Sequence, residues 1–167
     1  HLKYSIIVPN YRDNNINQII EQLKLIDNSE LIVIETSKQC LDNKHKGDIK
    51  YKFYSEKMFP GAARNEGAKH AKGEILVFID SDLLLTKKAI NFINSDEYDI
   101  KNNIVFGYYL PDQGKTIFSK FQNSILKYRF YDIYKKHAIR YGQSSHMIVS
   151  KENFDKIGGF NSSLRMR

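Results

Sequence analysis

The sequence predicts a single α/β domain built on a mostly parallel β-sheet. Three observations lead to this prediction. Short apolar strands alternate with helical segments along the first half of the chain, as in βαβ units with right-handed crossovers. The segment Ile75–Ile79 is apolar at every position, which is typical of a strand buried on both faces of a parallel sheet. A chain of 167 residues with 41% hydrophobic content suits one domain with a proper core.

The first half of the chain contains further segments with strand or helix character. The first strand is rich in β-forming residues and is ended by Pro9-Asn10. Apolar residues at helical spacing follow it, which predicts an amphipathic helix packed on the sheet. The second helix is rich in small residues, which permit close approach to the sheet, and Gly73 ends it. In chain order, we expect a strand at residues 4–8, a helix from Ile16 to Ile26, a strand at residues 31–34, a short strand at Tyr51 and Phe53, and a helix at about residues 62–71.

The second half of the chain is less regular. It contains a long basic and aromatic region of helical character, residues 115–141, whose apolar residues only partly follow one face. Ser150 is placed to cap a last short helix, which stops at Gly158-Gly159. The expected elements are a helix at residues 86–94, a strand at 104–110, the helical region at 115–141, a strand at 147–149 and the helix after Ser150.

Composition narrows the class of protein only a little. The net charge of +7 fits nucleic acid, a membrane surface or phosphorylated small molecules as partners, and does not choose between them. The single cysteine, Cys40, excludes an internal disulfide framework and fits a reducing cytosol. No stretch approaches the roughly 18–20 consecutive apolar residues of a membrane span. The N-terminus has no secretory pattern, so we expect a cytoplasmic location.

Two aspartates follow directly on Ile75–Ile79, in the tripeptide Asp80-Ser81-Asp82. Residues two apart on an extended segment point the same way, so both carboxylates are expected to face one site. That site would lie at the carboxyl end of a parallel strand, where open α/β sheets bind their ligands. Two carboxylates held together favour a cation between them, and hard oxygen ligands suit Mg²⁺ or Mn²⁺. Taken alone, the tripeptide fits a polar turn before the next helix equally well.

The residues around this tripeptide form a recognisable signature. Upstream lies the run Gly61-Ala62-Ala63-Arg64-Asn65-Glu66-Gly67, followed by Gly73-Glu74 and the apolar strand. This order closely resembles the family 2 glycosyltransferases of the GT-A fold, in which a G-x-A-x-A/x-R-N-x-G helix precedes a Gly-Glu strand and a D-x-D motif. Residues 5–11 are similar to the first strand of that family, and residues 154–160 to its F-x-x-I-G-G-F element. The resemblance covers nearly the whole chain.

The resemblance implies a GT-A, Rossmann-like sandwich that binds a nucleotide-diphosphate sugar. The donor would be a UDP-sugar in the commonest case, and the sugar would pass with inversion to a glycan or lipid-linked acceptor, as in polysaccharide biosynthesis. Residues 1–167 would form one domain, with a nucleotide-sugar-binding half at about 1–110 and an incomplete acceptor-side half at about 111–167. Asp82 and Asp80 would hold Mn²⁺ or Mg²⁺, which offsets the charge on the leaving diphosphate.

Several residues are expected to bind the donor on the strength of this resemblance. Pro9 fixes the backbone where the first strand opens, which makes a floor for the base. The guanidinium of Arg64 would reach base, ribose or phosphate, and the alternative is a surface ion pair with Glu66 or a neighbour. Asn65 is expected to order the local backbone instead. The expected donor-binding residues are Pro9, Tyr11, Glu35, Arg64, Asp80 and Ser81.

Glu35 stands at the end of the second strand, where the family usually carries Asp, often Asp-Asp. A carboxylate accepts a hydrogen bond from the ring N–H of uracil, so we expect Glu35 to contact the base. The residues that follow, Thr36-Ser37, lack a second acid. The base contact and the choice among UDP, GDP and dTDP therefore stay open.

The catalytic base that the resemblance implies is not visible in the sequence. In the family it is a carboxylate shortly after Gly-Gly-Phe, within reach of the acceptor hydroxyl. This sequence has no acid between Asp155 and its end at Arg167. We therefore expect the usual base position to lie beyond Arg167, in a chain truncated relative to the family pattern. Asp112 is an alternative base, and His146 has either a structural role or a contact with acceptor or diphosphate.

Other functions remain as alternatives. A nucleotidyltransferase would carry a glycine-rich loop after its first strand, whereas residues 9–14 contain no glycine. A degenerate glycosyltransferase would bind nucleotide sugar without turnover. A nucleic-acid-binding module would not explain the paired acids, so no nucleic acid is expected as a partner. Residues 115–141 form either an acceptor platform, a helix covering the sheet, or a peripheral contact with the inner face of a membrane.

Overall fold

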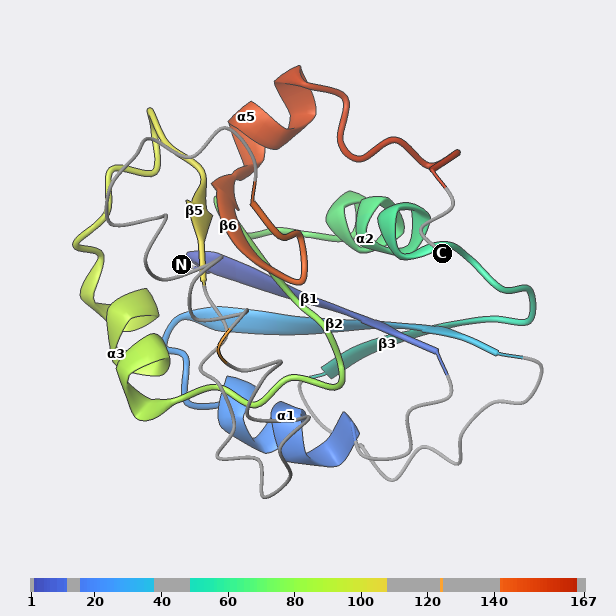
Figure 1. The fold of residues 1–167 in the computed structure, drawn as a ribbon, viewed down its shortest axis with the longest axis horizontal. Coiled ribbons are helices and arrows are strands. Elements are labelled where there is room, and N and C mark those ends of the chain that lie inside the picture. Colours follow the sequence, from blue (N-terminus) through green and yellow to red (C-terminus); the bar gives the residue numbers. More distant parts are fainter. Residues whose placement is uncertain (1, 12–15, 38–48, 108–123, 125–141, 165–167) are drawn as a thin grey trace.

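The computed structural model describes residues 2–11, 16–37, 49–107, 124 and 142–164 (Figure 1). Cys40, Asp112 and nearly all of residues 115–141 lie outside this described part, and so do the predictions made for them. The described residues form a six-stranded sheet with helices on both faces. Within them, no helix has both the length and the apolar character needed to cross a bilayer.

The elements follow the predicted order. Their bounds are β1 Tyr4–Asn10, α1 Ile16–Leu23, β2 Ser29–Thr36, β3 Ile49–Tyr54, α2 Pro60–Lys69, β4 Ile75–Ile79, α3 Lys87–Ser95, β5 Val105–Phe106, β6 His146–Ser150 and α5 Lys151–Lys156.

Several predicted bounds need correction. α1 ends at Leu23 and not at Ile26, β2 extends from Ser29 to Thr36 beyond the predicted 31–34, β3 is longer than predicted at both ends, and α2 ends at Lys69. The sequence predicts a first strand that ends at Val8, but β1 continues through Pro9 to Asn10. The second helix begins two residues earlier than predicted, with Pro60 in its first turn. Of the strand predicted at residues 104–110, the described residues form only Val105–Phe106.

The strand order is β3-β2-β1-β4-β6-β5. β1 pairs in parallel with both β2 and β4, and β3 pairs in parallel with β2, whereas β6 is antiparallel to β4 and β5. The chain therefore leaves β1 toward one edge of the sheet for β2 and β3, and returns on the other side of β1 for β4. The carboxyl ends of β1, β2 and β4 meet at this switch point, which is where open α/β sheets bind ligands.

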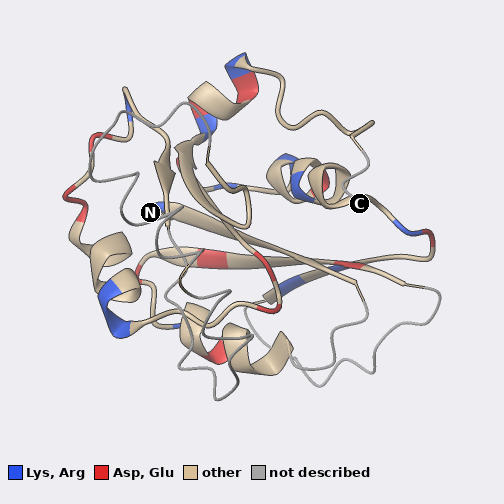
Figure 2. Cartoon of the chain, in the orientation of Figure 1, with Lys and Arg blue, Asp and Glu red and all other residues tan. Residues whose placement is uncertain are grey.

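The two faces of the sheet are buried by different helices, and in Figure 1 α1 and α2 lie on opposite sides of it. One core cluster joins α1 and α3 to residues such as Ile6, Val33 and Val77. The other joins α2 and α5 to their immediate neighbours in the strands, such as Ile7 and Ile34. β1 and β4 carry no charged residue, as Figure 2 makes visible. Nearly every residue of β1 and β4 is buried, which confirms a sheet covered on both sides.

α2 packs closely on the sheet because its inner face is made of small residues, as predicted. Ala63, Gly67 and Ala68 are buried against the strands. A side chain at Gly67 would collide with the side chain of Ile7, so glycine is required for this close approach.

A cap residue begins α5 and two glycines follow its end, as predicted. The hydroxyl of Ser150 accepts a hydrogen bond of 3.2 Å from the backbone N–H of Asn153, which confirms the predicted cap of α5. Gly158 and Gly159 follow with φ angles of 77° and 75°, a left-handed conformation that glycine adopts without strain. The chain turns there and passes back toward α2.

A buried polar cluster lies near the first residues of β1 and β2, away from the switch point. The carboxylate of Glu30 in β2 accepts hydrogen bonds from the hydroxyl of Ser5, from the ammonium of Lys50 and from the backbone N–H of Lys72. The hydroxyl of Ser5 in turn accepts a bond of 2.8 Å from the N–H of Gly73. Burial pulls the pKa of Glu30 upward, but these hydrogen bonds together hold it below its ordinary value. The cluster fixes the connection between α2 and β4.

Candidate functional site

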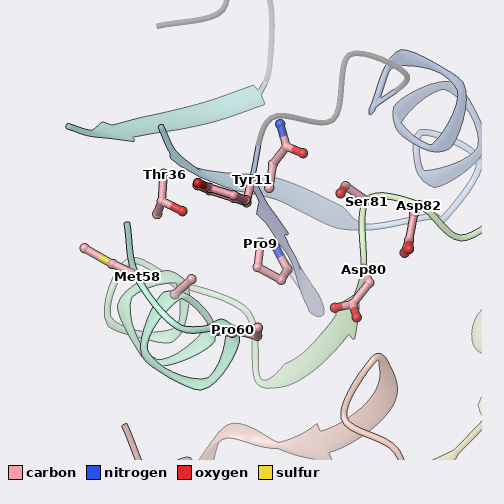
Figure 3. Close-up of a pocket in the computed structure, with 10 residues that line it drawn as sticks. Pro9, Tyr11, Thr36, Met58, Pro60, Asp80, Ser81 and Asp82 are labelled. Atoms are coloured by element: carbon pink, nitrogen blue, oxygen red, sulfur yellow. The ribbon is translucent and has the colours of Figure 1, made fainter. Parts of the chain in front are cut away.

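A hollow of about 250 Å³ opens at the switch point of the sheet (Figure 3). Residues from the ends of β1 and β2, from the start of α2 and from the turn after β4 line it. Its size lies just below the roughly 300–1,000 Å³ that ligand pockets usually have. The lining residues are Pro9, Asn10, Tyr11, Thr36, Met58, Pro60, Ala63, Asp80, Ser81 and Asp82.

One side of the hollow is formed by Asp80-Ser81-Asp82, as the sequence predicts. The geometric reason given for it is wrong, however. β4 ends at Ile79 and residues 81–82 form a turn, with a hydrogen bond of 3.2 Å from the N–H of Leu83 to the carbonyl of Asp80. The two carboxylates therefore reach the same hollow through a turn and not along an extended segment (Figure 3).

Arg64 lies behind this turn. Its side chain is buried in the middle of α2, and its Nη2 donates to Oδ1 of Asp80. Arg64 is not among the residues that line the hollow, and no described residue accepts a hydrogen bond from its Nε. Arg64 does form an ion pair, but its partner is Asp80 and not Glu66, which accepts from Tyr54 and Lys69. A direct contact of Arg64 with a donor stays a prediction.

Asn65, the next residue of α2, holds a distant part of the chain. Its Oδ1 accepts a bond of 2.8 Å from the N–H of Phe160, and its Nδ2 donates to the carbonyl of Phe160 at 2.8 Å and to Ser162 Oγ at 3.1 Å. The sequence predicts that Asn65 orders nearby backbone. The backbone that it orders belongs instead to the Gly-Gly-Phe turn, 95 residues further along the chain.

The other side of the hollow is formed by Thr36, Met58 and Tyr11, with Pro9 between the two sides (Figure 3). Tyr11 is 41% exposed, and Nζ of Lys57 lies 4.4 Å from the centroid of its ring. Pro9 and Tyr11 both line the hollow, and their contact with a base stays a prediction. Thr36 and Met58 were not predicted as site residues; the position of Thr36 at a strand end is the signal that would have found it.

Glu35 occupies a different position from the other predicted donor-binding residues. It is fully buried and does not line the hollow. Its Oε2 accepts hydrogen bonds from the amide nitrogen of Asn10 and, at 3.1 Å, from the hydroxyl of Tyr51. Its Oε1 has no hydrogen-bond partner among the described residues. A direct base contact of Glu35 stays a prediction.

His146 lies in β6 opposite Ile79 and is also outside the lining of the hollow. Its Nδ1 lies 2.8 Å from the hydroxyl oxygen of Ser145. Burial lowers the pKa of His146, although a hydrogen bond with Gly107 and the charge of Asp80 act in the opposite sense. The choice between a structural role and a contact with acceptor or diphosphate stays a prediction.

The chemistry that the hollow offers a cation can be judged from its donor set. Asp82 is exposed, and Asp80 shares one oxygen with Arg64. The described residues contain no group of three or more His, Cys, Asp or Glu side chains placed to hold a metal. Two carboxylates suit Mg²⁺ or Mn²⁺ only when other ligands complete the shell, and such ions commonly take those ligands from water and substrate phosphates. The residues present therefore fit a cation bound together with a phosphorylated ligand.

Comparison with known proteins identifies the family. Residues 5–158 match the family described as Glycosyl transferase family 2, and the chain belongs to that family. An uncharacterized glycosyltransferase of Rickettsia conorii is 33% identical in an alignment that covers 69% of this chain and 21% of the relative. One from Rickettsia felis is 32% identical with the same coverage. The chain thus spans about a fifth of the length of these relatives.

Solved structures establish the fold. The mannosyltransferase PcManGT from Pyrobaculum calidifontis, in complex with GDP-Man and Mn²⁺, superimposes with a TM-score of 0.70 at 18% identity, covering 97% of this chain and 48% of that chain. S. aureus TarS 1–349 gives a TM-score of 0.70 at 19% identity, covering 99% and 52%. The same protein in complex with UDP-GlcNAc gives 0.66 at 17% identity, covering 94% and 48%. The predicted GT-A fold is confirmed.

Proposed function

We propose that this domain binds a nucleotide-diphosphate sugar in the hollow at the switch point, with Mn²⁺ or Mg²⁺ held by Asp82 and Asp80. The sugar, a hexose or a related sugar, then passes with inversion to a glycan or lipid-linked acceptor in polysaccharide biosynthesis. Residues at about 1–110 form the donor half, and residues at about 111–167 belong to the acceptor-side half. The reaction takes place in the cytoplasm, at the inner face of the membrane when the acceptor is lipid-linked.

One observation carries this proposal. Two carboxylates after β4 and the strand ends of β1 and β2 line a single hollow, at the place where sheets of this kind bind nucleotides. The acidic side suits a cation with its diphosphate, and the side formed by Tyr11 and Met58 suits a flat base. PcManGT was solved with GDP-Man and Mn²⁺, and TarS with UDP-GlcNAc, which supports this class of ligand. UDP is our first choice of donor nucleotide.

The contacts suggest a separate role for each group around the hollow. When bound, the cation would neutralise the charge that grows on the leaving diphosphate. Arg64 holds Asp80 from behind through its buried ion pair. The N-terminus of α2 also faces the hollow through Pro60 and Ala63, so the positive end of the helix dipole favours an anion there. Ser81 would contact the donor between the two aspartates.

Calorimetry with UDP, GDP and dTDP, each with and without Mn²⁺, tests the proposal. We expect Mn²⁺-dependent binding of one nucleotide and its loss in Asp82→Ala. Asp155→Asn is the matched control, because Asp155 is an exposed carboxylate on α5 that pairs with Lys151, and it should bind like the unaltered chain. If the unaltered chain binds none of the three nucleotides in the presence of Mn²⁺, the proposal is wrong.

A further inference from the structure

The segment between Asp82 and α3 presents one apolar side chain to solvent. Leu83 and Leu85 pack against the core cluster on the α1 side, whereas Leu84 between them is 58% exposed. The backbone here is fixed, because the side-chain amide of Gln22 in α1 donates to the carbonyl of Leu85 at 3.0 Å and accepts from its N–H at 2.8 Å. Leu84 is therefore held in solvent, two residues after Asp82, which lines the hollow.

Two lysines at the start of α3 are placed where the helix itself disfavours them. Lys87 and Lys88 are the first residues of the helix, both are exposed, and its first turn contains no acid (Figure 2). The positive end of the helix dipole lies at this terminus, so cations there reduce the stability of the helix. The ion pairs among the described residues involve other lysines, so no described acid offsets the charge of either one.

The outer face of α3 adds a second apolar side chain. Residues four apart on a helix lie on the same face, so Phe92 neighbours Lys88. Phe92 is 40% exposed, whereas Ile90 on the opposite face is buried. Leu84 lies three residues before Lys87, so the chain places the two within roughly 11 Å of each other. The apolar and the basic side chains therefore share one small area of the surface.

Nearby acids do not cancel the positive charge of this area. Asp96 and Glu97 follow the far end of α3, and at 1.5 Å per residue Asp96 is roughly 13 Å from Lys87. That distance exceeds the Debye length of about 8 Å at physiological ionic strength, and Asp96 pairs with Lys3. Asp82 lies five residues before Lys87, and in the proposed function the bound cation offsets its charge.

We infer that Leu84, Lys87, Lys88 and Phe92 form a docking surface for an anionic lipid bilayer. The headgroup phosphates would accept hydrogen bonds from the two ammonium groups, and the two apolar side chains would enter the boundary between headgroups and acyl chains. A nucleic acid would offset the charges but leave Leu84 and Phe92 in water, so a lipid surface fits all four side chains. The meaning of this docking for the reaction rests on the proposed function: the hollow would lie beside the bilayer that carries a lipid-linked acceptor.

Co-sedimentation of the whole chain with vesicles tests the inference, with vesicles of phosphatidylcholine alone and of phosphatidylcholine mixed with phosphatidylglycerol. The unaltered chain should bind the mixed vesicles at least about tenfold more tightly than the neutral ones, and added salt should weaken this binding. Lys87→Gln/Lys88→Gln should weaken it about 10- to 30-fold, since each lysine near an anionic surface contributes about fivefold. Leu84→Ser should weaken it about 4- to 15-fold, the effect of one or two methylene groups leaving the lipid.

A matched control removes the same charge from the opposite side of the sheet. Lys151 and Lys156 lie on α5, which packs on the α2 side, so Lys151→Gln/Lys156→Gln changes the net charge by the same amount. This control should bind the mixed vesicles within about threefold of the unaltered chain, because its lysines lie away from the docking surface. Lys87→Gln/Lys88→Gln should stay folded, since it removes cations from a helix N-terminus, and should keep Mn²⁺-dependent nucleotide binding.

Specific results would overturn the inference. They are equal binding to neutral and mixed vesicles, equal losses in the α3 and α5 double variants, and unchanged binding in Leu84→Ser. Dimerisation of the unaltered chain that Leu84→Ser abolishes would assign the surface to a second copy and would contradict the inference as well. Mn²⁺-dependent nucleotide binding without vesicle binding would overturn the docking surface alone. Vesicle binding without nucleotide binding would overturn the proposed function alone.

Discussion

Arg64 in α2 and Asp80 after β4 form an ion pair in which the arginine is buried and the aspartate is partly exposed. The side chain of Arg64 is 4% exposed, whereas that of Asp80 is 31% exposed and faces the hollow. The arginine therefore depends on the aspartate for its only charged partner among the described residues. The aspartate has solvent and ligands available as well. This asymmetry leads to the first prediction.

Removal of Asp80 should cost more stability than removal of Arg64. Asp80→Ala leaves a buried guanidinium without a partner, and we expect a loss of about 3–5 kcal/mol in the free energy of unfolding. Arg64→Met keeps most of the side-chain volume and leaves a carboxylate that water can solvate, so the loss should be about 1–3 kcal/mol. Urea unfolding of both variants measures the difference. Equal losses, or a larger loss in Arg64→Met, would contradict the asymmetry.

Asn65 should control the mobility of the Gly-Gly-Phe turn. Asn65→Ala removes all three hydrogen bonds to Phe160 and Ser162, at a cost of about 1 kcal/mol each. Asn65→Asp keeps the acceptor for the N–H of Phe160 and loses both donations, so its effect should be smaller. Hydrogen exchange at residues 157–164 should become faster in the order Asp, then Ala. The amides of β4 serve as the internal control, and unchanged exchange in Asn65→Ala would refute the prediction.

Glu30 should make the domain less stable in acid. Its pKa is held below the ordinary 4.5, because hydrogen bonds from Lys50, Ser5 and Lys72 outweigh the effect of burial. A lowered pKa in the folded state means that the stabilisation is present above about pH 4.5 and is lost as the pH falls through the folded value. The stability difference between the unaltered chain and Glu30→Gln should therefore shrink between pH 6 and pH 3. Urea unfolding across this range checks it, and a constant difference would count against the cluster's role.

Gly67→Ala should destabilise the contact between α2 and the sheet. The added methyl group would collide with Ile7, and overpacking of this kind costs about 1–3 kcal/mol. Lys69→Ala, an exposed change on the same helix, should be nearly neutral. The double variant Gly67→Ala/Ile7→Ala should lose less than the sum of the two single losses, as contacting residues do. Additive losses would show that the collision is relieved elsewhere.

Much of the fold was predictable because it depends on local patterns. β4 has its predicted bounds because all five of its residues are apolar and buried. β1 was predicted too short because Pro9 normally ends a strand. Its pairing with β4 stops at Ile7, however, so beyond that point β1 pairs with no described strand on that side, where the missing N–H of a proline is tolerated.

The site was less predictable because its key contacts join distant segments. The position of Asp80 and Asp82 at a strand end follows from the sequence. The pairing of Arg64 with Asp80 depends on the packing of α2 against β4, which no local pattern encodes. Alternation along β2 separates Glu35 from Thr36, but only the position of α2 tells which of the two faces the hollow.

The side chains of successive helical residues point in directions roughly 100° apart. Arg64 and Asn65 therefore bind two different segments of the chain. One reaches the aspartate turn, and the other reaches the backbone of Phe160. A ligand that draws Asp80 forward would thus pull on the same turn of helix that anchors the chain after the Gly-Gly corner. Insertion or deletion of one residue in α2 would rotate the side chain of Arg64 or of Asn65 away from its partner. The aspartate turn and the Gly-Gly-Phe turn are therefore coupled through a single turn of α2.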